Sequence, residues 1–115
     1  MECFTDGNCV VVVVDKELDH HMASIIRTKV DRYLMTTGAK NVVFDFSKTE
    51  FMDSSGIGVI MGRYKIVKSF GGKIALTNQG KSVSRIVSIS GLHKIVDIFE
   101  TRQEAIKAYG GEENE

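Results

Sequence analysis

Short runs of β-branched residues alternate with segments of helical apolar spacing along almost the whole chain. Residues 8–15 hold five consecutive valines, and shorter apolar runs occur within positions 41–46 and 73–78. Such runs are typical of buried strands. Strands that alternate with helices favour an α/β fold with a mostly parallel sheet. The alternation therefore predicts an α/β sandwich, in which residues 3–5 form an antiparallel hairpin with the first strand.

Four segments carry helical start and stop signals. Aspartate, serine and threonine are good N-caps, and glycine often follows the last helical turn. The predicted helices run from Asp19 to Gly38, from Ser54 to Gly71, around Val83 to Gly91, and from a Thr101–Glu104 capping box to Gly110. Residues 94–99 are expected to form a further strand. We expect one domain over residues 1–110, followed by an acidic, disordered tail at 111–115.

The charge balance bears on possible partners. The chain has 115 residues, with 15 lysines and arginines against 15 aspartates and glutamates. A net charge near zero provides no overall field that would attract nucleic acid or an anionic membrane. No apolar run is long enough to span a bilayer, and the N-terminus lacks the basic region of an export signal. We therefore expect a cytoplasmic protein with no nucleic-acid or membrane partner.

The two cysteines, Cys3 and Cys9, lie on strand-like sequence. Their spacing places them on the same face of one strand or on neighbouring strands of a hairpin. A redox pair is one interpretation, but ordinary core or edge thiols are favoured. The sequence has no C-x-x-C motif and no second Cys/His cluster, so we predict neither a metal site nor a cofactor.

The loop SKTEFMDSSG, residues 47–56, joins a predicted parallel strand to the second long helix. Binding and catalytic sites collect at such carboxyl ends of strands. The loop ends in Asp53, Ser54 and Ser55, where the N-cap of the helix is expected. Three interpretations of these hydroxyls are a catalytic nucleophile, part of a phosphate-binding loop, or the target of a kinase.

The catalytic and phosphate-binding interpretations fit the spacing poorly. A nucleophile elbow requires G-x-S-x-G, and neither Ser54 nor Ser55 has a glycine two residues before it. Gly56, Gly58 and Gly62 form G-x-G-x-x-x-G, which is one residue longer than the dinucleotide fingerprint and does not directly follow the strand. Gly58 and Gly62 also share a helical face, and we expect this face to approach a neighbouring element or a partner closely.

The kinase interpretation fits the loop best. A phosphoryl group on a serine at a helix N-terminus adds about −1.5 to −2 charges and three acceptor oxygens. The amides of the first turn can accept such an anion without refolding. The neighbouring Asp53 would repel the new charge. Modification would therefore leave the fold intact and change the surface that a partner meets.

The segment MDSSGIGVIMGRYK, residues 52–65, resembles the signature of the anti-sigma-factor antagonists, which have the STAS fold. ELDHH at 17–21, GGKIAL at 71–76 and residues 90–105 follow in the order and spacing of that family. The resemblance covers nearly the whole chain and is strongest to the sporulation antagonists that govern the first forespore sigma factor, sigma F. It implies a small, mixed, mostly parallel sheet flanked by about four helices.

The resemblance also implies a non-enzymatic function in partner switching. Unphosphorylated antagonists bind an anti-sigma factor in its ADP form, and the sigma factor is released. The anti-sigma factor is also a serine kinase, which uses ATP to phosphorylate the first serine after the aspartate, here Ser54. The phosphoprotein dissociates, and a serine phosphatase restores the active form. The alternatives kept open are a small STAS protein that binds ATP or GTP, an antagonist in general stress, and a serine hydrolase.

The predicted partner-binding residues are Asp19, Met52, Asp53, Ser54, Ser55, Gly56, Gly58 and Arg63. Arg63 is expected to form an exposed basic edge with Lys65 and Lys68, either solvated or facing an acidic patch of the partner. One departure from the family pattern is Lys16, which stands where related chains commonly have glycine. The corresponding turn adjoins the phosphorylation loop in the family fold.

Overall fold

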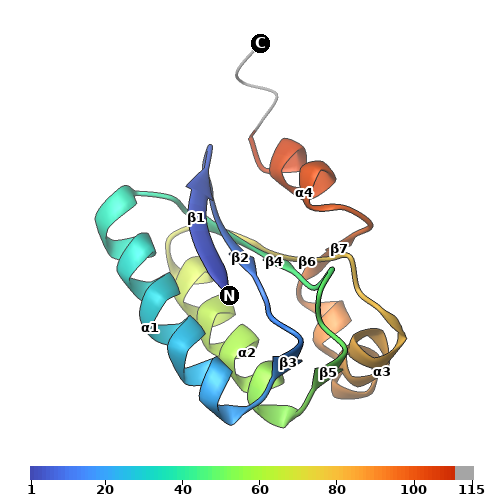
Figure 1. Ribbon diagram of the computed structural model, residues 1–115. Helices are drawn as coiled ribbons and strands as arrows, with labels where there is room; N and C mark the ends of the chain where they lie inside the picture. The colour runs from blue at the N-terminus through green and yellow to red at the C-terminus, as the bar shows by residue number, and fades with distance from the viewer. Residues whose placement is uncertain (111–115) are drawn as a thin grey trace.

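In the computed structural model, which describes residues 1–110, five strands form one mixed sheet in the order β1-β2-β4-β6-β7 (Figure 1). The strands are β1 (Glu2–Asp6), β2 (Cys9–Val13), β4 (Asn41–Asp45), β6 (Ile74–Thr77) and β7 (Asp97–Phe99). β1 pairs with β2 in antiparallel register, and all the other neighbours are parallel. The predicted α/β architecture with a mostly parallel sheet and an N-terminal hairpin is confirmed.

Four α-helices cover the two faces of this sheet unequally. They are α1 (His20–Thr37), α2 (Ser54–Ser69), α3 (Lys81–Ser90) and α4 (Arg102–Ala108). One face packs against α1, α2 and α3, and the other packs against α4. Side chains alternate across a strand, so Val10 and Val12 enter the larger core and Val11 and Val13 the smaller one. The valine run is therefore buried on both faces, as its composition predicts.

The helix boundaries follow the predicted capping signals. Asp19 caps α1, and Gly38 ends it with a left-handed φ of 79°. Thr101 and Glu104 form the complete capping box of α4. Gly91, the predicted end of α3, is its C-cap and also adopts a left-handed φ, of 80°. The expected acidic tail, residues 111–115, lies outside the described residues.

The hairpin places the two cysteines on neighbouring strands and on opposite faces. Cys3 lies opposite Val12 in the register, and Cys9 lies opposite Asp6. Cys3 contacts the larger core and Cys9 belongs to the smaller one, and both thiols are free. Burial raises the pKa of Cys3 to about 11 and that of Cys9 to about 12. Their positions on opposite faces argue against a disulfide between them, and the placement agrees with the interpretation as core or edge thiols.

One local expectation needs correction, and one small sheet was not predicted. Residues 94–99 do not form one strand, because a 3-10 turn occupies Leu92–Lys94 and β7 begins only at Asp97. A second, two-stranded sheet, which the residue pattern does not predict, pairs β3 (Glu17–Leu18) with β5 (Phe51–Met52) in parallel. Two-residue strands carry no periodicity, so only the tertiary structure reveals them. In the described part of the chain, no helix combines the length and apolar character needed to cross a bilayer.

Candidate functional site

The small β3–β5 sheet brings the starts of α1 and α2 to the same end of the molecule (Figure 1). Leu18 pairs with Met52, and the backbone N–H of Asp53 donates a hydrogen bond to the Leu18 carbonyl over 3.3 Å. The next residues along the two segments, Asp19 and Asp53, are the N-caps of α1 and α2, with nearly equal backbone angles. The sheet thus places two equivalent aspartate caps beside the predicted site.

Asp53, and neither serine, caps α2. The Asp53 carboxylate accepts a hydrogen bond from the Ser55 backbone N–H at 2.8 Å, just as Asp19 accepts one from Met22 N–H at 3.0 Å. Ser54 is the first helical residue and is exposed, whereas Ser55 is half-buried. Within residues 1–110, the Ser54 hydroxyl makes no hydrogen bond to a protein group. The carboxylate supplies the cap, and the Ser54 hydroxyl remains accessible on the first turn.

Gly56 is a packing residue beneath this turn. It is buried, and a Cβ at this position would lie 2.6 Å from Met52 Sδ and 3.0 Å from Leu18 Cγ. Contacts of this kind are too close for a side chain. Met52 itself is only 4% exposed. The first turn of α2 therefore packs against β3 and β5 at Gly56. The buried Met52 side chain lies beneath this turn.

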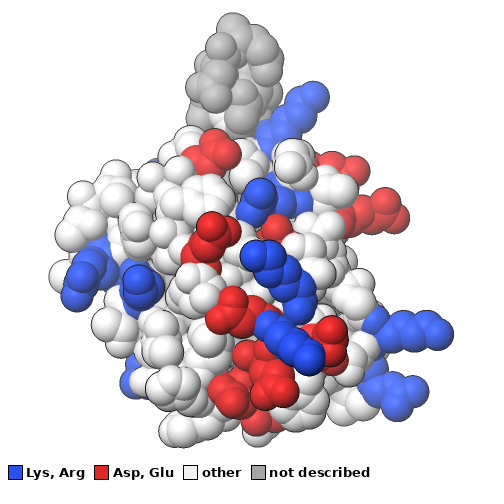
Figure 2. Space-filling model, viewed as in Figure 1, with Lys and Arg blue, Asp and Glu red and all other residues white. Residues whose placement is uncertain are grey.

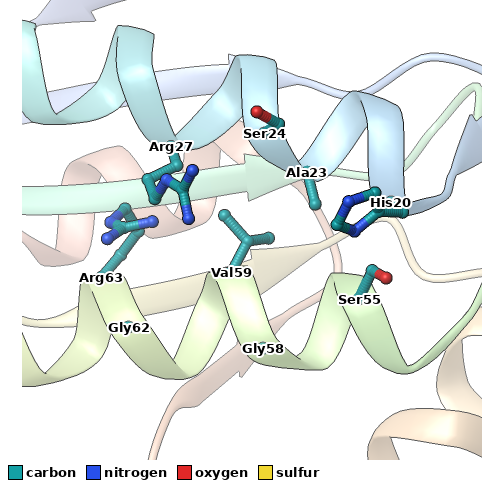
Figure 3. Close-up of a pocket in the computed structure, with 9 residues that line it drawn as sticks. All are labelled: His20, Ala23, Ser24, Arg27, Ser55, Gly58, Val59, Gly62 and Arg63. Carbon is teal, nitrogen blue, oxygen red and sulfur yellow. The ribbon is translucent and has the colours of Figure 1, made fainter.

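Gly58 and Gly62 have a different environment. A Cβ at either position would meet no atom within 4 Å, so the expected close approach to a neighbouring element of the fold is wrong. Both glycines instead line a groove of about 380 Å³ between α1 and α2 (Figure 3). His20, Ala23, Ser24 and Arg27 line it from α1, and Ser55, Val59 and Arg63 line it from α2. The groove runs from Ser55 along the glycine face.

Arg63 is not part of an exposed basic edge. Its side chain is 7% exposed, and its Nε lies 2.9 Å from Asp31 Oδ1 on α1. Burial lowers the pKa of the Arg63 guanidinium, and the Asp31 carboxylate partly opposes this effect. Lys65 and Lys68 are exposed as predicted. Residue spacing alone missed the burial of Arg63, because its ion-pair partner belongs to a different helix.

Acidic side chains gather over the region of β3 and β5, close to the start of α2 (Figure 2). Glu17 and Glu50 are exposed there, and Lys16 lies 3.8 Å from Glu50. The Lys16 ammonium partly offsets the negative charge of this surface. Among residues 1–110, no three His, Cys, Asp or Glu side chains are arranged to hold a metal ion, although His20 and His21 adjoin Asp19.

Comparisons of the sequence with known proteins identify its family. The chain matches the STAS domain family over residues 2–105. It is 35% identical over 97 residues to the anti-sigma F factor antagonist of Paenibacillus polymyxa, which covers 84% of this chain and 83% of that protein. It is also 34% identical over 91 residues to the anti-sigma-B factor antagonist of Bacillus subtilis strain 168, with coverage of 79% and 82%.

Solved structures extend the likeness to three dimensions. The anti-sigma factor antagonist SpoIIAA in its unphosphorylated form superposes with a TM-score of 0.85 at 29% identity, covering 96% of both chains. The phosphorylated form of the Bacillus cell fate determinant SpoIIAA gives 0.74 at 28% identity, covering 93% of this chain and 96% of that one. The chain therefore belongs to the STAS-domain family of anti-sigma factor antagonists, which are regulators rather than enzymes.

Proposed function

We propose that this chain is a phosphorylation-controlled antagonist that binds an anti-sigma factor with serine kinase activity, and that Ser54 is the residue phosphorylated. The observation that carries the proposal is the division of tasks at the start of α2. Asp53 provides the helix cap, and Ser54 presents an exposed hydroxyl without a structural role in the described chain. A kinase can use such a hydroxyl without disturbing the fold.

The transfer step needs no catalytic group from this chain. Ser54 Oγ attacks the γ-phosphorus of ATP held by the kinase, the bond from phosphorus to the bridging oxygen of ADP breaks, and the serine proton passes to a base of the kinase. The products are phosphoserine and ADP. The phosphoserine and the β-phosphate of ADP, which are both negatively charged, then face each other across the interface. Asp53 adds a further negative charge beside the phosphoserine. This repulsion accounts for dissociation of the phosphorylated form.

The proposed contact surface surrounds Ser54. At the starts of α1 and α2, three residues of this surface are half-buried: Asp19, Asp53 and Ser55. Gly58 is exposed one turn further along α2. Phe51, 48% exposed on β5, adds an apolar anchor that the residue pattern did not identify. Gly56, Met52 and Arg63 are buried and contribute by supporting this surface rather than by touching the partner.

A serine phosphatase would restore the active form, and the cycle would operate in the cytoplasm where sigma factors act. A role in sporulation rests on the similarity to the anti-sigma F factor antagonist. A general-stress role rests on the nearly equal identity to the anti-sigma-B factor antagonist. Phosphorylation assays with the purified kinases of both classes would separate these assignments, since the cognate kinase should act much faster.

The experiment that tests the proposal is an intact mass spectrum after incubation with the anti-sigma kinase of the same genome and ATP. The wild-type chain should gain one phosphoryl group, and Ser54→Ala should gain none. Ser55→Ala is the matched control, because it removes the adjacent hydroxyl, and it should still be phosphorylated. An increment on Ser54→Ala but not on Ser55→Ala would move the site to Ser55 and overturn the assignment.

A further inference from the structure

The groove between α1 and α2 holds more positive than negative charge, although the whole chain is neutral. We propose that this groove is a binding site for a phosphate oxyanion, either free or as the phosphate of a small monoester. The proposal does not depend on Ser54, which does not line the groove. It therefore adds a ligand site to the protein beyond its proposed part in partner switching.

Two guanidinium groups meet at one end of the groove. Figure 3 shows Arg27 of α1 and Arg63 of α2 side by side there. Asp31 is the carboxylate that pairs with Arg63, and it is itself partly exposed. Arg27 acts on Arg63 as a like charge and opposes its positive form. One carboxylate for two arginines leaves an excess of positive charge, and a bound anion would neutralise it.

The hydrogen-bonding state of Arg63 points in the same direction. The Arg63 side chain is only 7% exposed, and it lines the groove. Its Nε is engaged by Asp31 Oδ1 at 2.9 Å, whereas its two Nη groups make no hydrogen bond within residues 1–110. Buried donors are normally satisfied, and a guanidinium presents a planar set of donors that matches phosphate. An oxyanion in the groove would supply acceptors for the Nη groups of Arg63.

The shape of the groove suits a compact ligand. Gly58 and Gly62 place no side chain in it, and its volume of about 380 Å³ exceeds what one phosphate requires. Ala23 and Val59 provide a short apolar wall. His20 and Ser55 lie at the end opposite the arginines, where they can hydrogen-bond a hydroxyl group (Figure 3). A phosphate at the arginine end and a small polar body along the glycines would fill the space.

The test is isothermal titration calorimetry of the purified, unphosphorylated chain with inorganic phosphate and with glycerol 3-phosphate, at constant ionic strength in chloride. Saturable binding of one equivalent is expected. Arg27→Gln should weaken it about tenfold or more, because it removes a charge-assisted contact. Arg32→Gln makes the same change at an exposed position of α1 outside the groove and should bind as the wild type does.

A second variant tests the free volume of the groove rather than its charge. Gly62→Leu should fold, because a Cβ there meets no atom and leucine favours helices, yet its side chain enters the groove and should reduce the affinity. A higher affinity for glycerol 3-phosphate than for inorganic phosphate would identify a monoester as the ligand. Equal affinities for the two would identify a free oxyanion as the ligand. No saturation at millimolar concentrations, or equal affinities of Arg27→Gln and Arg32→Gln, would overturn the proposal. Ser54→Ala should bind normally, so this result is independent of the phosphorylation assay.

Discussion

The Asp53 carboxylate accepts the backbone N–H of Ser55 at 2.8 Å, and the Ser54 between them is left out of the helix cap. This arrangement separates the structural and regulatory tasks of two adjacent residues. The residue pattern left the cap of α2 open among Asp53, Ser54 and Ser55, and the structure assigns it to Asp53. A residue that changes its chemical state can thus occupy the first turn without removing the cap of the helix that carries it.

The first prediction concerns the stability of this turn. Ser54→Ala should lower the free energy of unfolding by less than about 0.5 kcal/mol, because an exposed hydroxyl without a partner is removed. Asp53→Ala should cost about 1 kcal/mol, because it removes the N-cap. Urea unfolding followed by circular dichroism measures both. A larger loss for Ser54→Ala than for Asp53→Ala would show that the serine supports the helix after all.

The second prediction concerns charge at Ser54. Ser54→Asp should weaken binding to the anti-sigma partner, although one carboxylate imitates a phosphate only in part. Ser54→Asn is the matched control, because it has nearly the same shape without the charge, and it should bind more tightly than Ser54→Asp. Calorimetric titration of the two variants measures the difference. Equal affinities would show that repulsion is not the cause of release.

The third prediction contrasts two glycines of α2. Gly56→Ala should destabilise the protein by about 1–3 kcal/mol, because the new methyl group must displace the Met52 and Leu18 side chains. Gly58→Ala should be neutral or stabilise by up to about 1 kcal/mol, since its Cβ meets no atom and alanine favours helices. Thermal and urea unfolding of the two variants provide the comparison. Similar losses at both positions would contradict the packing described for Gly56.

The fourth prediction concerns the cysteines. Burial raises the pKa of Cys3 from 9.0 to about 11 and that of Cys9 from 9.0 to about 12. Because the folded state holds these protons more tightly, the thiols contribute full stability below pH 9, and this contribution is lost as the pH rises toward 11 and 12. The wild type should therefore lose more stability over this range than a Cys3→Ala/Cys9→Ala variant. Equal pH dependence of urea unfolding in the two proteins would refute the assignment.

Much of the fold could be predicted from local sequence because its signals are local. The valine run, the caps at Asp19 and Thr101 and the glycine stop at Gly38 each act within a few residues, and each prediction is confirmed. The β3–β5 pairing could not be predicted in this way, because Leu18 and Met52 are distant in sequence and their strands are only two residues long.

The candidate site was predictable in outline but not in detail. The sequence of residues 53–55 indicated a capped helix start, yet which side chain caps it depends on backbone geometry. Arg63 looked like part of a basic edge, because its burial depends on Asp31 of another helix. The groove beside Gly58 and Gly62 also arises from the packing of α1 against α2, so no local pattern could indicate it.

The most direct measurement is the affinity of the chain for the ADP-loaded anti-sigma factor before and after phosphorylation of Ser54. Calorimetric titration should show tight binding of the unmodified chain and binding weaker by about a hundredfold or more after modification, as expected for a charge of about −2 placed in an interface. Circular dichroism should show the same fold for both forms. Equal affinities of the two forms would contradict a phosphorylation switch at Ser54.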